Sequence, residues 1–170
     1  MKRISILAIW LTISMVIFTN TGCQKDVPQV NTSNIVTLDH DLATEWYKLA
    51  LSLVDRTNGY AEPIAARAMS YLGYTLYESS VSGMKDYKSQ QTVLDGFQVT
   101  LPQADINKEY YYALVANEAM YIIVKHLFGA SGSDSYAKIE TLRNSFEKRY
   151  SADIALVVKE DSKKVREIYW

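Results

Sequence analysis

Histidine and cysteine side chains supply most protein nucleophiles and metal ligands, and this sequence contains few of them. Its 170 residues include two histidines, His40 and His126, and a single cysteine, Cys23. His40 lies between two aspartates, but neighbouring residues do not have the spacing that places ligands on one face of a helix or strand. His126 precedes Gly129, where a positive side chain suits the C-terminus of a helix. We therefore assign no catalytic residue and no metal ligand.

Two further sequence patterns are associated with catalysis. The stretch Gly129–Ser133 has the small residues of a phosphate-binding loop, but no Lys-Ser or Lys-Thr pair follows it and no strand is expected before it. A helix end followed by a turn explains it better. No Gly-x-Ser-x-Gly motif for a serine nucleophile is present.

The single cysteine closes an N-terminal segment that has the pattern of a lipoprotein signal peptide. Lys2 and Arg3 give a positive start, Ile4–Phe18 is almost entirely apolar, and small residues lead up to Cys23. We predict that residues 1–22 are removed and that Cys23 is the site of lipid attachment. Asn20 departs from the aliphatic residue usual at that position. A buried or free structural cysteine is the alternative, and a lone cysteine forms no disulfide within the chain.

Removal of residues 1–22 leaves enough chain for one domain, with a slightly acidic balance. It retains 16 of the 18 basic residues and all 19 acidic residues, a formal charge of −3. This charge does not suit nucleic acid or an anionic membrane surface, so we expect no nucleic-acid partner. Residues 23–38 are polar, which predicts a tether between the domain 39–170 and lipid on Cys23. The predicted location is the cell envelope. The outer membrane is favoured because no acidic residue directly follows Cys23.

Apolar residues recur at helical spacing through most of the remaining chain. The predicted fold class is therefore all-α, a bundle of about five helices. The expected helices are one capped by Asp39 that ends at the turn Arg56–Gly59, Glu62–Ser82, Lys108–Phe128, one capped by Ser133 or Asp134, and one that begins near Ser151 or Asp153. Between Lys85 and Asn107 the pattern is irregular, and Phe97–Leu101 fits a loop over the helices or a short strand.

The stretch Tyr60–Ser89 predicts a helix with sharp ends and unusually small side chains. Pro63 suits the first turn of a helix, where its missing N–H has no partner to lose. Gly83 offers a natural end. Gly73 in mid-helix costs about 1 kcal/mol relative to alanine. We therefore expect a neighbouring helix to approach closely at Gly73.

The same stretch resembles a family pattern. Its elements are Tyr-x-x-Pro-x-x-Ala-Arg-Ala, Tyr-x-Gly, Leu-Tyr-Glu and Gly-Met-x-x-Tyr-x-Ser, in order from Tyr60 to Ser89. It is similar to the N-terminal helical region of bacterial lipoproteins related to vanadium-dependent haloperoxidases and type 2 phosphatidic acid phosphatases. The resemblance covers about Leu42–Trp170 and implies that Arg67 and Glu78 fasten the helical scaffold. These two lie about 16 Å apart along a helix, too far to pair directly.

The catalytic residues of that family have no counterparts here. In the family, a Lys, an Arg-Pro pair, a Pro-Ser-Gly-His motif and a later Arg and His hold a phosphate or vanadate oxyanion. This sequence has neither an Arg-Pro pair nor a Pro-Ser-Gly-His motif, and neither histidine has a matching context. The resemblance implies vanadate or phosphate only in a catalytic half that this chain lacks. We expect no cofactor on the chain and no activity from it alone.

The last residues, Lys163–Trp170, keep helical spacing and end on two aromatic residues without a stop signal. We expect a chain cut within a helix, with a separate or missing catalytic half as its partner. Docking of Trp170 into the bundle is the alternative. The sequence thus predicts a lipid-anchored, non-catalytic N-terminal part of a haloperoxidase- or phosphatase-like enzyme. The alternative is a complete, non-enzymatic envelope lipoprotein that acts as a binding or scaffold module.

Overall fold

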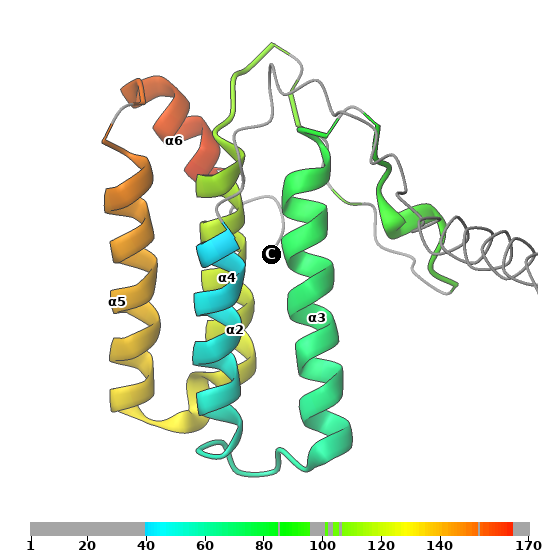
Figure 1. Cartoon of the computed structure of the whole chain (residues 1–170), viewed down its shortest axis with the longest axis vertical. Coiled ribbons are helices and arrows are strands. Elements are labelled where there is room, and N and C mark those ends of the chain that lie inside the picture. The colour runs from blue at the N-terminus through cyan, green and yellow to red at the C-terminus, as the bar shows by residue number, and fades with distance from the viewer. Residues whose placement is uncertain are drawn as a thin grey trace, which may run out of the picture. The chain divides into compact units, whose positions relative to one another are not determined.

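The protein is a bundle of α-helices (Figure 1). The computed structural model describes residues 40–84, 86–95, 101, 104–105, 107–152 and 154–164, all within one compact unit. In these ranges there are five α-helices and no strand, which confirms the predicted fold class. The helices are α2 (His40–Val54), α3 (Glu62–Val81), α4 (Tyr112–Phe128), α5 (Ser133–Tyr150) and α6 (Leu156–Lys164), with two short 3-10 turns, η2 (Gln90–Thr92) and η3 (Gly129–Ser131).

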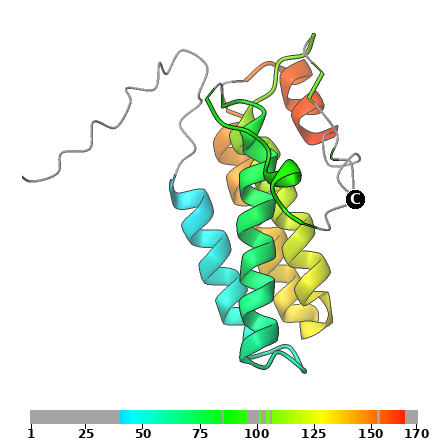
Figure 2. The ribbon, with the colours of Figure 1, turned by 90° about the vertical axis from the view of Figure 1, so that its right-hand side faces the viewer.

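Helix α4 forms the centre of the bundle. It packs against α2, α3, α5 and α6, and the views in Figures 1 and 2 agree on this arrangement. All nine residues from Ala113 to Tyr121 are buried. Successive residues of a helix point in all directions around its axis, so this stretch of α4 is enclosed on every side.

The outer helices each bury one face against α4. In α2 and in α5 four positions each are buried, at helical spacing, as expected for helices with one face in water. The buried apolar residues of these helices are Leu42, Trp46, Ala50, Leu53, Ile139, Phe146 and Tyr150. The core is therefore built mainly by α2, α4 and α5, with Ala68 and Leu72 from α3.

Several predicted boundaries hold and others move. Helix α2 ends before the predicted turn, in which Gly59 has a positive φ of 88°. Helix α3 ends one residue before the predicted Ser82 and has Pro63 in its first turn. Helix α4 begins at Tyr112 rather than Lys108, and α6 begins at Leu156 rather than near Ser151.

Helix α4 ends at Phe128 as predicted, but the connection from α4 to α5 lacks the expected side-chain cap. Gly129 keeps a helical φ of −59°, and the chain continues through η3. The reversal comes at Gly132, whose φ of 101° is readily adopted only by glycine. Gly132 is therefore the N-cap of α5, while Ser133 and Asp134 lie inside the helix. The prediction of a Ser133 or Asp134 cap was wrong because the 3-10 turn moves the chain reversal from Gly129 to Gly132. The N-cap position therefore falls on Gly132, one residue before Ser133.

Some sequence predictions fall on residues outside the described ranges. They are the signal peptide 1–22, the tether 23–38 with lipid site Cys23, the cap Asp39, the fragment Phe97–Thr100, Asp153 and the last six residues. Among the helices that are described, none has the length and hydropathy needed to span a membrane.

Candidate functional site

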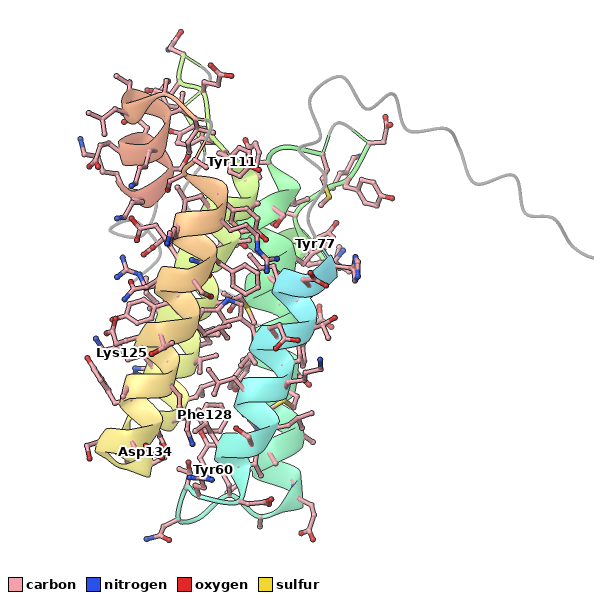
Figure 3. All side chains as sticks on the ribbon, turned by 60° about the vertical axis from the view of Figure 1, so that its left-hand side comes forward. Tyr60, Tyr77, Tyr111, Lys125, Phe128 and Asp134 are labelled. Atoms are coloured by element: carbon pink, nitrogen blue, oxygen red, sulfur yellow. The ribbon has the colours of Figure 1, made fainter. Side chains whose placement is uncertain are left out.

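The residues that carry the family resemblance lie on α3 and at its two ends. At the start, the Tyr60 hydroxyl donates a hydrogen bond to the Leu127 carbonyl at 2.7 Å. The Tyr60 ring lies 4.9 Å from the Phe128 ring, centroid to centroid, and the two residues are neighbours in Figure 3. Burial raises the pKa of the Tyr60 phenol. Tyr60 therefore joins the start of α3 to the end of α4 and remains a neutral donor.

Gly73 makes room for a tyrosine from α2. A Cβ at Gly73 would lie 2.9 Å from the Tyr47 hydroxyl oxygen, which is closer than real Cβ contacts allow. That hydroxyl donates to the Met69 carbonyl at 3.2 Å, one turn before the glycine. The expected close approach at Gly73 is thus made by a side chain of α2.

Gly83 makes room for a ring from α4. A Cβ at Gly83 would lie 2.5 Å from two ring carbons of Tyr112. Helix α3 does end close by, at Val81, but Gly83 is not among the glycines with positive φ. The predicted helix end near Gly83 is therefore confirmed, although the left-handed conformation common for such a glycine is not present. Contact with Tyr112 is what requires a small residue.

Arg67 and Glu78, which the resemblance assigns to the scaffold, have different surroundings. Glu78 is buried, and its Oε1 accepts a hydrogen bond from the Gln90 backbone N–H at 2.7 Å. This contact holds the segment after α3 against the last turns of that helix. Arg67 is exposed on α3, as is Pro63. The two charged side chains thus do not pair, as their separation along the helix predicted.

A buried acidic residue on α4 begins a chain of ionic contacts. Glu118 is 1% exposed, and its Oε1 accepts from Arg143 Nε at 2.9 Å. Its other oxygen, Oε2, has no hydrogen-bond partner in the described part of the chain. Arg143 also lies 4.0 Å from Glu147, which in turn contacts Lys163 at 2.8 Å and Lys159 at 3.4 Å. The network joins α4 to α5 and α5 to α6.

Sequence reasoning missed this network. Its signal is the pair Asn117-Glu118 inside the otherwise apolar run of α4. Polar groups at the centre of such a run must be buried, and buried polar groups need partners. The run therefore indicated that partners exist, although not which residues they are.

Helix α6 is attached to the bundle mainly through polar groups. Its one buried residue is Ser162, whose Oγ accepts from the Tyr111 backbone N–H at 2.9 Å. Lys108 and Asp161 form a further ion pair at 2.9 Å. Leu156 and Val157 point into solvent and are 72% and 71% exposed. The attachment of α6 therefore depends more on charge and hydrogen bonds than on apolar burial.

A second polar cluster lies between α4 and α5. Lys125 Nζ donates to the Tyr121 hydroxyl at 2.8 Å, and that hydroxyl donates to Glu140 at 2.5 Å. Lys125 also lies 4.7 Å from the Tyr136 ring centroid. Hydrogen bonds to Tyr121 and then Tyr136 raise the pKa of Lys125, and burial, followed by the bond to Glu140, raises the pKa of Tyr121. Both groups hold their protons at neutral pH, so neither is prepared to act as a base or nucleophile.

The histidines do not form a site in the part of the chain that is described. His40 is exposed and lies 3.3 Å from Asp41, and His126 is also exposed. Over those same residues, no group of three or more His, Cys, Asp and Glu side chains could hold a metal ion. A surface depression of about 610 Å³ lies between α5 and α6, lined by Asn144, Glu147, Lys148, Ser151, Ala152 and Lys159. It contains neither histidine nor cysteine.

Four residues of the stretch Tyr60–Ser89 make contacts within the bundle. Tyr60, Gly73, Glu78 and Gly83 are each engaged in contacts that join helices or hold a turn. Comparison of the chain with protein-family models, with curated proteins and with solved structures found no match.

Proposed function

We propose that this chain is the lipid-anchored, non-catalytic helical part of a cell-envelope protein related to vanadium-dependent haloperoxidases and type 2 phosphatidic acid phosphatases. Lipid on Cys23 would hold it at a membrane, with the outer membrane favoured. Its role would be to pack against a catalytic half that supplies the oxyanion-binding residues. Vanadate or phosphate would bind in that half and not in this chain.

One observation supports this proposal above the others. Three of the residues through which the sequence resembles the family are used for packing or for holding a turn: Gly73 accepts Tyr47, Gly83 accepts Tyr112, and buried Glu78 holds the Gln90 backbone. Internal contacts of this kind support a structural role for these three residues. A shared architecture does not by itself carry a shared chemistry, so the resemblance supports a scaffold role and not a catalytic one.

The lipid anchor and the lack of activity are tested on the full-length protein expressed in bacteria. We expect a mature chain that begins at Cys23 and has the mass of an added diacylglycerol, and we expect Cys23→Ser to lack that mass. The purified chain should neither oxidise bromide with vanadate and peroxide nor hydrolyse a phosphate ester. Turnover by the purified chain would contradict the proposal.

The catalytic half is tested separately. The DNA after codon 170 should encode, in one of its frames, a Pro-Ser-Gly-His segment followed by an Arg and a His. Coexpression of that segment with this chain should yield a complex that neither part forms with an unrelated helical bundle. Absence of such a segment would count against this parentage and leave the lipid anchor unaffected.

The second function, a complete non-enzymatic lipoprotein, is favoured by the enclosure of α4. The described helices cover its buried stretch without help from another protein. This function requires one cooperative unfolding transition and little binding of a hydrophobic dye. Strong dye binding or aggregation by the purified chain would favour the missing-half proposal instead.

A further inference from the structure

Three exposed apolar side chains gather in the segment that follows α3. Tyr87, Val93 and Leu94 lie within eight consecutive residues, and Val93 is 68% exposed. Large apolar side chains at a protein surface are ordinary when they are scattered singly. Three of them within one short segment are instead a candidate for a surface used in interaction, since contiguous exposed apolar surface marks such sites.

Two backbone groups of the same segment form hydrogen bonds with α3. The Lys88 carbonyl accepts the Tyr77 hydroxyl at 2.8 Å, and the Gln90 N–H donates to Glu78 at 2.7 Å. The Ser89 hydroxyl accepts from the Gln91 N–H at 3.1 Å and caps the turn η2. The backbone is thus fixed by hydrogen bonds while the apolar side chains remain in solvent.

The segment lies near the end of the bundle at which α2 begins. Tyr47 of α2 meets α3 at Gly73, and the two helices run in opposite directions (Figure 1). Both helices rise 1.5 Å per residue. Seven residues from Tyr47 towards the start of α2 therefore cover the same distance along the bundle as seven residues from Gly73 towards the end of α3. His40 is level with about Ser80, next to the turn that holds the segment. Figure 2 shows the start of α2 and this segment at a similar height.

The start of α2 is also the described point nearest in sequence to the proposed lipid. Sixteen residues, 24–39, separate Cys23 from His40. A chain of that length spans at most about 60 Å, and a flexible one averages about 23 Å end to end. The opposite end of α2 lies a further 22 Å or so along the helix. On average, a lipid on Cys23 would therefore lie closer to the end that bears Tyr87, Val93 and Leu94 than to the opposite end.

We propose that Tyr87, Val93 and Leu94 form a lipid-contact patch that enters the boundary between the headgroups and acyl chains of the bilayer that holds this lipid. The proposal rests on the lipid anchor proposed above and adds the surface by which the bundle contacts the membrane. Valine and leucine suit the apolar side of that boundary. Tyrosine suits the boundary itself, because its ring is apolar and its hydroxyl remains hydrated.

The charges beside the patch indicate which lipid surface it suits. Residues 85–95 contain two lysines and two aspartates, so the stretch has no net charge. Attraction to anionic headgroups requires a basic cluster, which this stretch lacks. The partner is therefore a zwitterionic surface such as phosphatidylcholine, contacted through apolar side chains.

Spin labels placed on the full-length, processed protein in phosphatidylcholine vesicles test the patch. The lipid occupies the Cys23 sulfur, so a thiol introduced by Val93→Cys or Leu94→Cys is the only one that a nitroxide reagent can reach. Leu51→Cys is the matched control, because Leu51 is an apolar residue that is 56% exposed near the other end of α2. We expect labels at 93 and 94 to be several-fold more accessible to oxygen, relative to a nickel chelate, than the label at 51.

Each other outcome would overturn the patch. Equal oxygen-to-nickel ratios at 93 and 51, with lipid on Cys23 verified by mass, would mean that the anchor exists and the patch does not contact lipid. A label at 93 that is immobile and inaccessible to both reagents would mean that protein covers the patch. Two labels per chain would mean that Cys23 is free, so the anchor and the patch would fail together.

Discussion

The indole N–H of Trp46 on α2 donates a hydrogen bond of 3.0 Å to Asn117 Oδ1 on α4, and both side chains are fully buried. The amide nitrogen of Asn117 donates in turn to the Arg143 carbonyl on α5, also at 3.0 Å. One side-chain amide therefore sets the positions of three helices relative to one another.

Trp46→Phe should destabilise the protein by about 2–4 kcal/mol. The change leaves the Asn117 oxygen buried without its donor, which alone costs about 1–3 kcal/mol, and it also leaves a small cavity. Urea unfolding of the chain without residues 1–22 measures the loss. The control is Leu51→Ala, an exposed position on the same helix, which should change stability by less than about 0.5 kcal/mol. Equal stability of the two variants would refute the role of this hydrogen bond.

Gly83→Ala and Gly129→Ala should have different effects on stability. The new Cβ at Gly83 meets the Tyr112 ring at 2.5 Å, and an overpacked contact of this kind costs about 1–3 kcal/mol. At Gly129 nothing lies within 4 Å and φ is helical, so alanine should be neutral or slightly stabilising. Thermal unfolding of the two variants decides the matter. A left-handed stop at Gly83 would instead make Gly83→Ala harmful even when Tyr112 is replaced by alanine.

The contact between Gly73 and Tyr47 should appear as a coupling in a double-mutant cycle. Alanine is about 1 kcal/mol better than glycine within a helix. In the Tyr47→Phe background, where the hydroxyl is absent, Gly73→Ala should gain close to this amount. With Tyr47 present the gain should vanish or reverse, because the hydroxyl must leave Met69. Additive effects within about 0.3 kcal/mol would mean that the two residues do not interact.

Arg143→Met should be among the most destabilising substitutions in the described part of the chain. It leaves the carboxylate of Glu118 buried without its cation, at a cost of about 3–5 kcal/mol. Adding Glu118→Met should recover much of the loss, because it removes the unpaired charge. Arg56→Met, which breaks an exposed contact with Asp134, is the control and should cost less than about 1 kcal/mol. Failure of the second substitution to rescue the first would show that charge burial is not the cause.

The attachment of α6 should weaken in acid. Burial would raise the pKa of Glu147, but hydrogen bonds and charges from Lys163 and Lys159 outweigh it and lower the pKa below its ordinary value. The stabilisation is therefore complete above the unfolded pKa of about 4.3 and is lost as pH falls through the lower folded value. We expect amide protection in α6 to fall below about pH 4, ahead of protection in α4.

The same experiment with two variants identifies the residue responsible. Glu147→Gln should reduce α6 protection at pH 7 and remove most of its acid dependence. Glu160→Gln, an exposed carboxylate on α6 itself, should change neither. An unchanged acid profile in Glu147→Gln would mean that another group controls the attachment.

Local sequence patterns predicted the helices more successfully than the contacts between them. Apolar spacing and turn residues predicted α2, α3 and the all-α class, because those signals act over three or four residues. The start of α4 and the cap of α5 were wrong, since both depend on turns whose geometry is set by the packing around them. The hydrogen bond between Trp46 and Asn117 spans 71 residues of sequence, and no local pattern could identify that pair.

Gly83 shows the same limit at a single residue. Its type and its place predicted a helix end, and α3 does end close by, at Val81. The real constraint is the Tyr112 ring on α4, which approaches from a helix that the sequence places nearly thirty residues later. The sequence correctly singled out this glycine, but the reason that a small residue is needed there is a tertiary contact.

The central position of α4 makes the protein unequally tolerant of early termination. A stop after Tyr150 would remove a helix that buries a single serine. A stop before Ser133 would remove α5 and expose the side of α4 that packs against it. In the complete bundle, α4 is a seventeen-residue helix that is buried along most of its length. During synthesis the core therefore cannot close until α5 has emerged. Messages or chains broken within α5 should be cleared by proteolysis, whereas those broken within α6 should persist.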